Sequence, residues 1–148
     1  MNRQRLRIFL GIVLLLASAF AAWGWLRPYA WREDPAARAK VAGVLVTRDQ
    51  SYFWVEAHLK MNPGEEHDLR QAVFLETPGG KLDPADTTFG GREGEGTTDL
   101  WFKFWLDERQ ASGPLALHLN EGVLSIRTRQ QLPALEGSSS RYFTTNQW

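Results

Sequence analysis

The sequence predicts an all-β protein, a small antiparallel β-sandwich preceded by a single N-terminal transmembrane helix. Three observations carry this prediction. An uncharged, apolar segment near the N-terminus is about as long as a membrane is thick. Beyond residue 40, apolar residues alternate with polar ones, and a period of two is that of a β-strand. Turn residues interrupt this alternation roughly every 8–12 residues, which is the spacing of a small sandwich.

The first 26 residues have the features of a membrane anchor. Residues 1–7 carry three Arg and no acidic residue, and residues 8–26 follow without a charge or a Pro. As an α-helix, this second stretch rises roughly 28 Å, which is just enough to cross the hydrocarbon core. Amphipathic rings partition into the headgroup region, where we expect the aromatic residues that come next: Trp23, Trp25, Tyr29 and Trp31.

A cleaved signal peptide is the main alternative for this segment, because the small residues at 17–19 or 20–22 could form a cleavage site. Two features favour retention. The apolar stretch continues past both positions to Leu26, and an aromatic girdle has no use in a discarded peptide. A buried helix of a soluble protein is a third interpretation, but a helix that is apolar all round needs a much larger protein to surround it.

The distribution of charge sets the expected orientation. Six Arg and two acidic residues give residues 1–39 a net charge of +4, whereas residues 40–148 carry −4. The Arg cluster before the helix favours a cytoplasmic N-terminus, and Glu33 and Asp34 offset the basic residues on the other flank. We therefore expect a single-pass protein of a bacterial-type inner membrane, with its main domain in the periplasm or outside the cell. The signal-peptide interpretation also places residues 32–148 outside the cytoplasm.

The chain divides into five predicted segments. Asp34 followed by Pro35 is a helix-start signal, so the linker after the anchor is expected to contain a short helix. The segments are a cytoplasmic n-region at 1–7, a transmembrane signal-anchor helix at 8–26, the linker at 27–40, an extracytoplasmic β-sandwich at 41–128 and an aromatic C-terminal tail at 129–148.

Alternation and turn residues predict about seven short strands in the sandwich. Residues 83–98 contain four Gly and are expected to form a loop. No helix long enough to connect parallel strands is expected between the strands, so the sheets should be antiparallel, as in an immunoglobulin-like sandwich. The strands are expected at 41–47, at 52–61, at 71–76, from 81, at 99–107, at 115–119 and at 123–127.

Composition excludes several classes of function. A net acidic domain argues against nucleic-acid binding, which needs a basic patch. The chain has no Cys, which rules out disulfides, thiolate metal sites and a lipid-anchored Cys. The sequence has no catalytic signature and no cofactor motif, so we expect a protein that is not an enzyme, with no catalytic residues and no bound cofactor.

Two candidate metal sites have simpler interpretations. His58 and His118 each lie on the polar face of a predicted strand, and they could form a ligand pair only if those strands were neighbours. Acidic residues between positions 83 and 99 offer oxygen ligands to calcium, but their spacing does not match an EF-hand loop. We expect solvated histidines, an ordinary loop and no metal.

The candidate functional surface is the polar face of two strands. If the apolar residues of 99–107 fill the core, Trp101, Lys103 and Trp105 project outward, and Trp54 joins them if its strand is adjacent. Exposed Trp residues mark protein interfaces, sugar-stacking platforms or membrane contacts. Alternatively, the tail or the linker covers them, or both faces of the strand are buried. The tail has three aromatic residues that we expect to dock on the domain or on a partner: Tyr142, Phe143 and Trp148.

These features predict a non-enzymatic accessory or assembly subunit of a larger membrane protein complex, with respiratory and photosynthetic complexes among the hosts. Its partners would be the lipid bilayer and other subunits, reached through the helix and the outward Trp residues. The main alternative is an extracytoplasmic ligand-binding module, such as a carbohydrate-binding domain that uses Trp101 and Trp105 as a stacking platform. A metal-handling or enzymatic periplasmic domain is a third hypothesis.

Overall fold

A computed structural model describes residues 3–26 and 31–148, which belong to two separate compact units. The first unit contains the helix α1 (Arg3–Leu26), whose described side chains are all exposed. The mean hydropathy of this helix reaches 2.1, so it is long and apolar enough to cross a membrane, as a signal sequence would also be. Trp23 and Trp25 lie near its C-terminal end, whereas Tyr29 lies outside the described residues.

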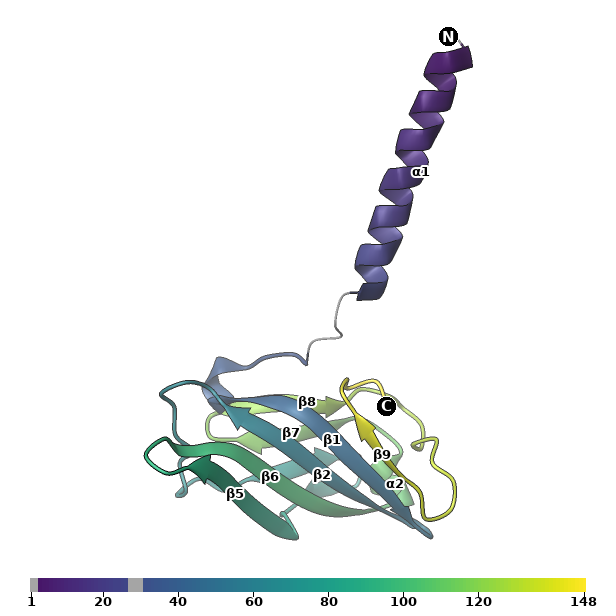
Figure 1. The fold of residues 1–148 in the computed structure, drawn as a ribbon. Helices are drawn as coiled ribbons and strands as arrows, with labels where there is room; N and C mark the ends of the chain where they lie inside the picture. Colours follow the sequence, from purple (N-terminus) through teal and green to yellow (C-terminus); the bar gives the residue numbers. More distant parts are fainter. Residues whose placement is uncertain (1–2, 27–30) are drawn as a thin grey trace. The chain divides into compact units, whose positions relative to one another are not determined.

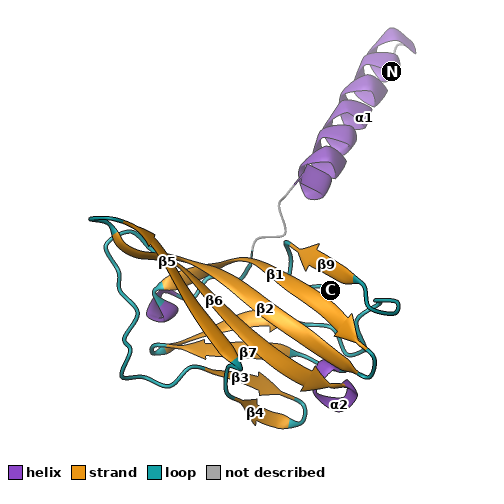
Figure 2. Cartoon of the chain, turned by 60° about the horizontal axis from the view of Figure 1, so that its bottom comes forward, coloured by secondary structure: helices purple, strands orange, loops and turns teal. Residues whose placement is uncertain are grey.

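The second unit is mostly β, and its described residues form nine strands in two antiparallel sheets that lie face to face (Figure 1). A five-stranded sheet has the order β5-β6-β2-β1-β9, and a four-stranded sheet has the order β4-β3-β7-β8 (Figure 2). The strands are β1 (Ala39–Asp49), β2 (Tyr52–Met61), β3 (Phe74–Thr77), β4 (Gly80–Leu82), β5 (Asp86–Arg92), β6 (Gly96–Asp107), β7 (Leu115–Leu119), β8 (Gly122–Arg127) and β9 (Ser140–Phe143).

The core lies between the sheets and follows the predicted alternation. Every second residue is buried from Phe53 to Leu59 in β2 and from Leu100 to Leu106 in β6, and the side chains between them point away from the core. This confirms the predicted faces of both strands, which exchange main-chain hydrogen bonds along their length. Each buried Leu or Phe side chain contributes roughly 1.5–3 kcal/mol to folding. The buried residues of these two strands are Phe53, Val55, Ala57, Leu59, Leu100, Phe102, Phe104 and Leu106.

Residues 83–98 do not form the expected loop. They contain β5 and the start of β6, and these strands pair from Asp86 to Arg92. Thr87, Thr88 and Phe89 favour an extended chain, and the glycines serve close packing here. A Cβ at Gly91 would overlap the main-chain oxygen of the opposite strand, so the glycine-rich composition reflects pairing and not flexibility.

The tail and residues 31–40 of the linker both belong to the sandwich unit. Residues 140–143 of the tail form β9, which pairs with β1 at the edge of the five-stranded sheet. The linker contains the expected short helix as a single 3-10 turn, η1 (Pro35–Ala37), capped by a hydrogen bond from the Ala36 N–H to Asp34. Trp31 is partly buried and packs against the core of the sandwich, and its contact with lipid headgroups stays a prediction.

A second short helix, α2 (Glu108–Ala111), follows β6 and has a capping box that the sequence analysis did not predict. The Asp107 carboxylate accepts from the Gln110 N–H, and the Gln110 side chain accepts from the Asp107 N–H. These two bonds satisfy main-chain groups at the helix start and end β6 sharply.

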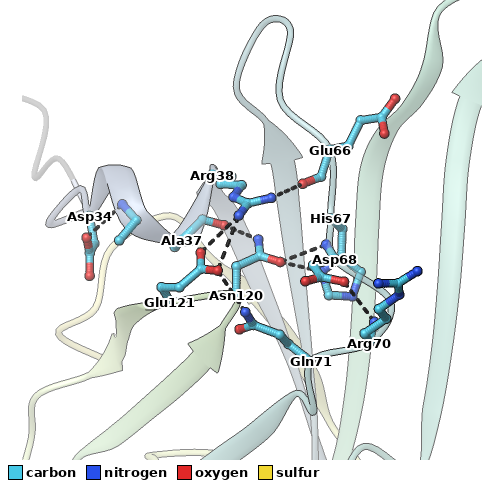
Figure 3. A network of polar contacts seen from close by, with 11 residues as sticks. Asp34, Ala37, Arg38, Glu66, His67, Asp68, Arg70, Gln71, Asn120 and Glu121 are labelled. Atoms are coloured by element: carbon cyan, nitrogen blue, oxygen red, sulfur yellow. Dashed lines mark hydrogen bonds and ion pairs between the residues drawn. The ribbon is translucent and has the colours of Figure 1, made fainter.

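A network of polar contacts fastens the linker to the sandwich (Figure 3). The Arg38 guanidinium lies 3.1 Å from the Glu121 carboxylate, which also accepts a hydrogen bond of 2.7 Å from Gln71. The Asn120 amide donates to the Ala37 carbonyl, and its oxygen accepts from the Asp68 N–H (Figure 3). The network thus joins the linker, the connection between β2 and β3, and the turn between β7 and β8.

The linker lies so close to β8 at Gly122 that a larger residue does not fit there, which can be tested. The φ of Gly122 is ordinary, but a Cβ there would overlap the main chain of Ala37. We expect Gly122→Ala to lower the free energy of unfolding by about 1–3 kcal/mol, because the main chain has to shift. Urea denaturation of the full chain in detergent measures this. Gly79→Ala is the comparison: its Cβ would meet only side chains, those of Gln110 and Thr77, so a smaller loss is expected there. An equal loss in both variants would contradict the prediction.

Candidate functional site

The predicted surface residues come together on the outer face of the five-stranded sheet. The pairing of β2 with β6 sets Trp54 opposite Trp105 and His58 opposite Trp101, with Lys103 between the two Trp residues on its own strand. We call this surface the outer face. It also includes Tyr52 from β2 and Tyr142 from β9. The condition that the strand of Trp54 be adjacent is therefore met.

Four side chains of the outer face stack in sequence. The Lys103 ammonium lies 4.7 Å from the centroid of the Trp54 ring, which stacks on Trp105 at 5.8 Å with 19° between the planes. The Tyr52 and Trp105 rings lie 4.4 Å apart and are tilted by 32°. Tyr52 and Trp105 nevertheless remain 41% and 49% exposed. The stack holds large aromatic groups in place while leaving much of two of them in contact with water.

Trp101 is held differently, between its two neighbouring strands. Its ring stacks on His58 at 4.6 Å with 6° between the planes. On the other neighbour, a Cβ at Gly90 would lie 2.7 Å from the Trp101 ring, so the ring rests on the main chain of β5. Trp101 is therefore only half-exposed, and it does not form a joint platform with Trp105.

His58 also forms a hydrogen bond with the Asp99 carboxylate on the outer face. Its Nε2 lies 2.7 Å from Asp99 Oδ1, and the Thr98 hydroxyl donates to Asp99 Oδ2 at 2.8 Å. The hydrogen bond from His58, and then that from Thr98, lower the pKa of Asp99 below its ordinary value because both stabilise the carboxylate. The pair thus fixes the imidazole that supports the Trp101 ring.

The aromatic residues of the tail divide between the surface and the core. Tyr142 is exposed, and its ring lies across β1, where only a glycine, Gly43, leaves room for it. Phe143 stacks on Trp148 at 5.4 Å, and the Trp148 indole N–H donates to the Ile126 carbonyl at 3.0 Å. Trp148 is 6% exposed, so of the two expectations for this ring, docking on its own domain or on a partner, the structure shows the first: the ring completes the protein's own core.

The described residues contain no group of three or more His, Cys, Asp or Glu side chains that could hold a metal ion. His58 and His118 belong to different sheets, and each contacts one carboxylate, the latter bonding to Glu76 at 2.8 Å. Of the acidic residues considered for calcium, Asp99 is engaged by His58, and Asp86 lies in β5 opposite Lys103.

Sequence reasoning overlooked three residues that contribute to the outer face. Tyr52 precedes Trp54 by two residues, so the period of a strand could have placed both rings on one side. Gly43 and Gly90 accommodate aromatic rings from neighbouring strands, and no signal within either glycine's own strand indicates this role.

Comparisons with known proteins do not identify this chain: no family model, no curated protein and no solved structure matches it. The outer face therefore has to be interpreted from its own geometry. That geometry supplies stacked rings, half-exposed Trp side chains and one ordered carboxylate, which are features of a binding surface.

The His58–Asp99 contact predicts a pH-dependent contribution to stability. Because folding lowers the pKa of Asp99, its contribution is complete above the unfolded value, about 4, and is lost as the pH falls through the folded value. We expect Asp99→Asn to lower the free energy of unfolding by about 1–2 kcal/mol at pH 7, and by less near pH 3.

Denaturation of the full chain at both pH values measures this difference. Asp49→Asn is the matched control, because Asp49 is an exposed carboxylate at the end of β1. A loss in Asp99→Asn that is the same at both pH values would contradict the assignment of the stabilisation to the ionised carboxylate.

Proposed function

We propose that this protein is a non-enzymatic, membrane-anchored accessory or assembly subunit of a larger membrane complex, and that the outer face docks a protein partner. The single observation that carries the proposal is the set of exposed aromatic rings on one sheet face. Tyr52, Trp105 and Tyr142 are all exposed there. Trp and Tyr are the residues that most often dominate protein interfaces, because they bury large area at a small cost in side-chain entropy.

A protein partner suits this face better than a sugar does. A sugar platform needs the flat face of a ring to be open, whereas the rings here are stacked on one another. Trp101 lies between His58 and the main chain of β5, and Trp54 carries the Lys103 ammonium. The outer face combines exposed aromatic rings with polar side chains such as Lys103, as protein interfaces combine apolar and polar groups. A carbohydrate-binding module remains the second candidate, since Trp105 is half-exposed.

We further propose that the sandwich is immunoglobulin-like. The seven strands of a constant-type immunoglobulin domain divide into a four-stranded and a three-stranded sheet, with the first, second, fifth and fourth strands adjacent in that order. The order β1-β2-β6-β5 and the order β3-β7-β8 correspond to these two sheets, with β4 and β9 as additional edge strands. The chain has no Cys, so the disulfide of antibody domains has no counterpart.

The helix α1 serves as the anchor in this proposal, spanning a bacterial-type inner membrane with its N-terminus in the cytoplasm. Only four positions in the sequence, 27–30, separate it from the first residue of the sandwich unit. Such a tether raises the effective concentration of the outer face for a partner in the same membrane. Small residues on the helix allow close approach of other helices: Gly11, Ala17, Ser18, Ala21, Ala22 and Gly24.

The docking proposal predicts that the exposed rings control association. The double variant Tyr52→Ser, Trp105→Ser should weaken capture of the native partner from detergent-solubilised membranes by roughly tenfold or more, because hot-spot rings contribute over 2 kcal/mol. Quantitative mass spectrometry of the subunits co-purified with the full chain measures this. Thermal unfolding of the variant verifies that the domain still folds.

Val123→Ser is the matched control, since Val123 is 43% exposed on the four-stranded sheet. Capture should be unchanged in this variant. A wild-type chain that purifies without any associated subunit would overturn the proposal. Binding to a glycan array that disappears in Trp105→Ser would instead select the carbohydrate-binding candidate.

The anchor proposal predicts that the membrane fraction contains the uncleaved chain. Its intact mass should be 16.8 kDa. The chain should also stay in the membrane pellet after alkaline carbonate treatment, which releases proteins held at the surface by charge but does not extract a helix that spans the bilayer. A shorter chain in the soluble fraction, beginning after residue 19 or 22, would identify the segment as a signal peptide. The docking test above remains valid in that case, which separates the two proposals.

A further inference from the structure

Apart from the outer face, the sandwich has a pocket of about 290 Å³ between the end of β8 and the tail. Three Arg side chains line it, and no acidic residue does. This is unusual in its surroundings, because residues 40–148 carry a net charge of −4. The pocket is lined by Arg127, Arg129, Gln131, Leu132, Ala134, Arg141, Phe143, Thr145, Gln147 and Trp148.

Arg127 is the buried member of this group, with 1% of its surface exposed. Its guanidinium donates only to main-chain oxygens among the described residues, at 2.8 Å to Ala111 and 3.3 Å to Gly113, and also to Gln131 and Trp148. Burial, with a smaller effect of Arg129, lowers the pKa of Arg127 to about 10, so the group is still charged at neutral pH. In the 148-residue chain, the Trp148 oxygen belongs to the terminal carboxylate and pairs with Arg127, so the charges left open to a ligand are those of Arg129 and Arg141.

Stacking places a second positive charge beside the first. The Arg127 guanidinium lies 5.0 Å from the centroid of the Trp148 ring, and Arg141 lies 5.2 Å from that of Phe143. Because the two rings stack on each other, the two guanidinium groups are held on one aromatic unit. Arg129 is exposed and approaches from the residues that follow β8. None of the three forms an ion pair with a side-chain carboxylate in the described part of the chain.

We propose that this pocket binds an anion that carries a phosphate group. Guanidinium groups match the several oxygens of phosphate with paired donors, and Thr145 and Gln147 add neutral donors at the rim. The volume exceeds that of phosphate alone, and Leu132 and Ala134 provide an apolar wall for an organic substituent. Two sources have this chemistry, a soluble phosphate ester and the headgroup of an anionic lipid.

Calorimetric titration of the full chain in a non-ionic detergent tests the proposal at constant ionic strength. One arm uses inorganic phosphate, and the other uses dihexanoyl phosphatidylglycerol, with dihexanoyl phosphatidylcholine for comparison. Arg129→Gln combined with Arg141→Gln should weaken binding by roughly tenfold or more, because it removes two charged donors. Both residues are exposed, so the variant is expected to fold, whereas an Arg127 variant would not isolate binding from folding.

Arg70→Gln combined with Arg92→Gln is the matched control, since it removes the same charge from exposed residues that do not line the pocket. Binding in the phosphate arm identifies a site for soluble phosphate compounds, and binding of phosphatidylglycerol alone identifies a headgroup site. The proposal is overturned if neither probe binds. It is also overturned if the pocket variant and the control lose affinity equally.

Discussion

The pairing of β2 with β6 is the constraint on which the rest of the structure depends. Phe53 opposes Leu106 on the inside, and Trp54 opposes Trp105 on the outside. A slip of one residue would place Trp rings in the core and Phe rings in water, so burial fixes the register strongly. The same pairing therefore determines both the packing of the sandwich and the composition of the outer face.

The fold could be predicted from sequence where a segment carries its own pattern. The bounds of β2 match the prediction, and so does the inward face of β6, because alternation over ten or more residues is a local signal. β5 and β9 could not be predicted in this way. Gly90 and Gly91 give no alternation, and they are explained only by the Trp101 ring and the main chain of β6 beside them.

The candidate site, too, could be predicted only where a local sequence pattern places its residues. The spacing alone places Trp101 and Trp105 on one face, and the structure adds that Trp101 is partly buried whereas Trp105 is exposed. The burial of Trp148 depends on Arg127, which lies 21 residues away. The sequence gives no sign that a charged residue at the end of a strand is buried. The packing of Trp148 against Arg127 could therefore not be predicted from the sequence and is known only from the structure.

The protein uses the same interaction, a cation over stacked rings, in two surroundings with different results. At the tail, burial strengthens the contact between Arg127 and Trp148 to roughly 2 kcal/mol, which favours a locked chain segment. On the outer face, water keeps the contact between Lys103 and Trp54 nearer 0.5–1 kcal/mol. A partner that covers the outer face would exclude this water and strengthen the contact, which offsets part of the cost of desolvating Lys103. The exposed stack is thus suited to a surface that becomes buried on association.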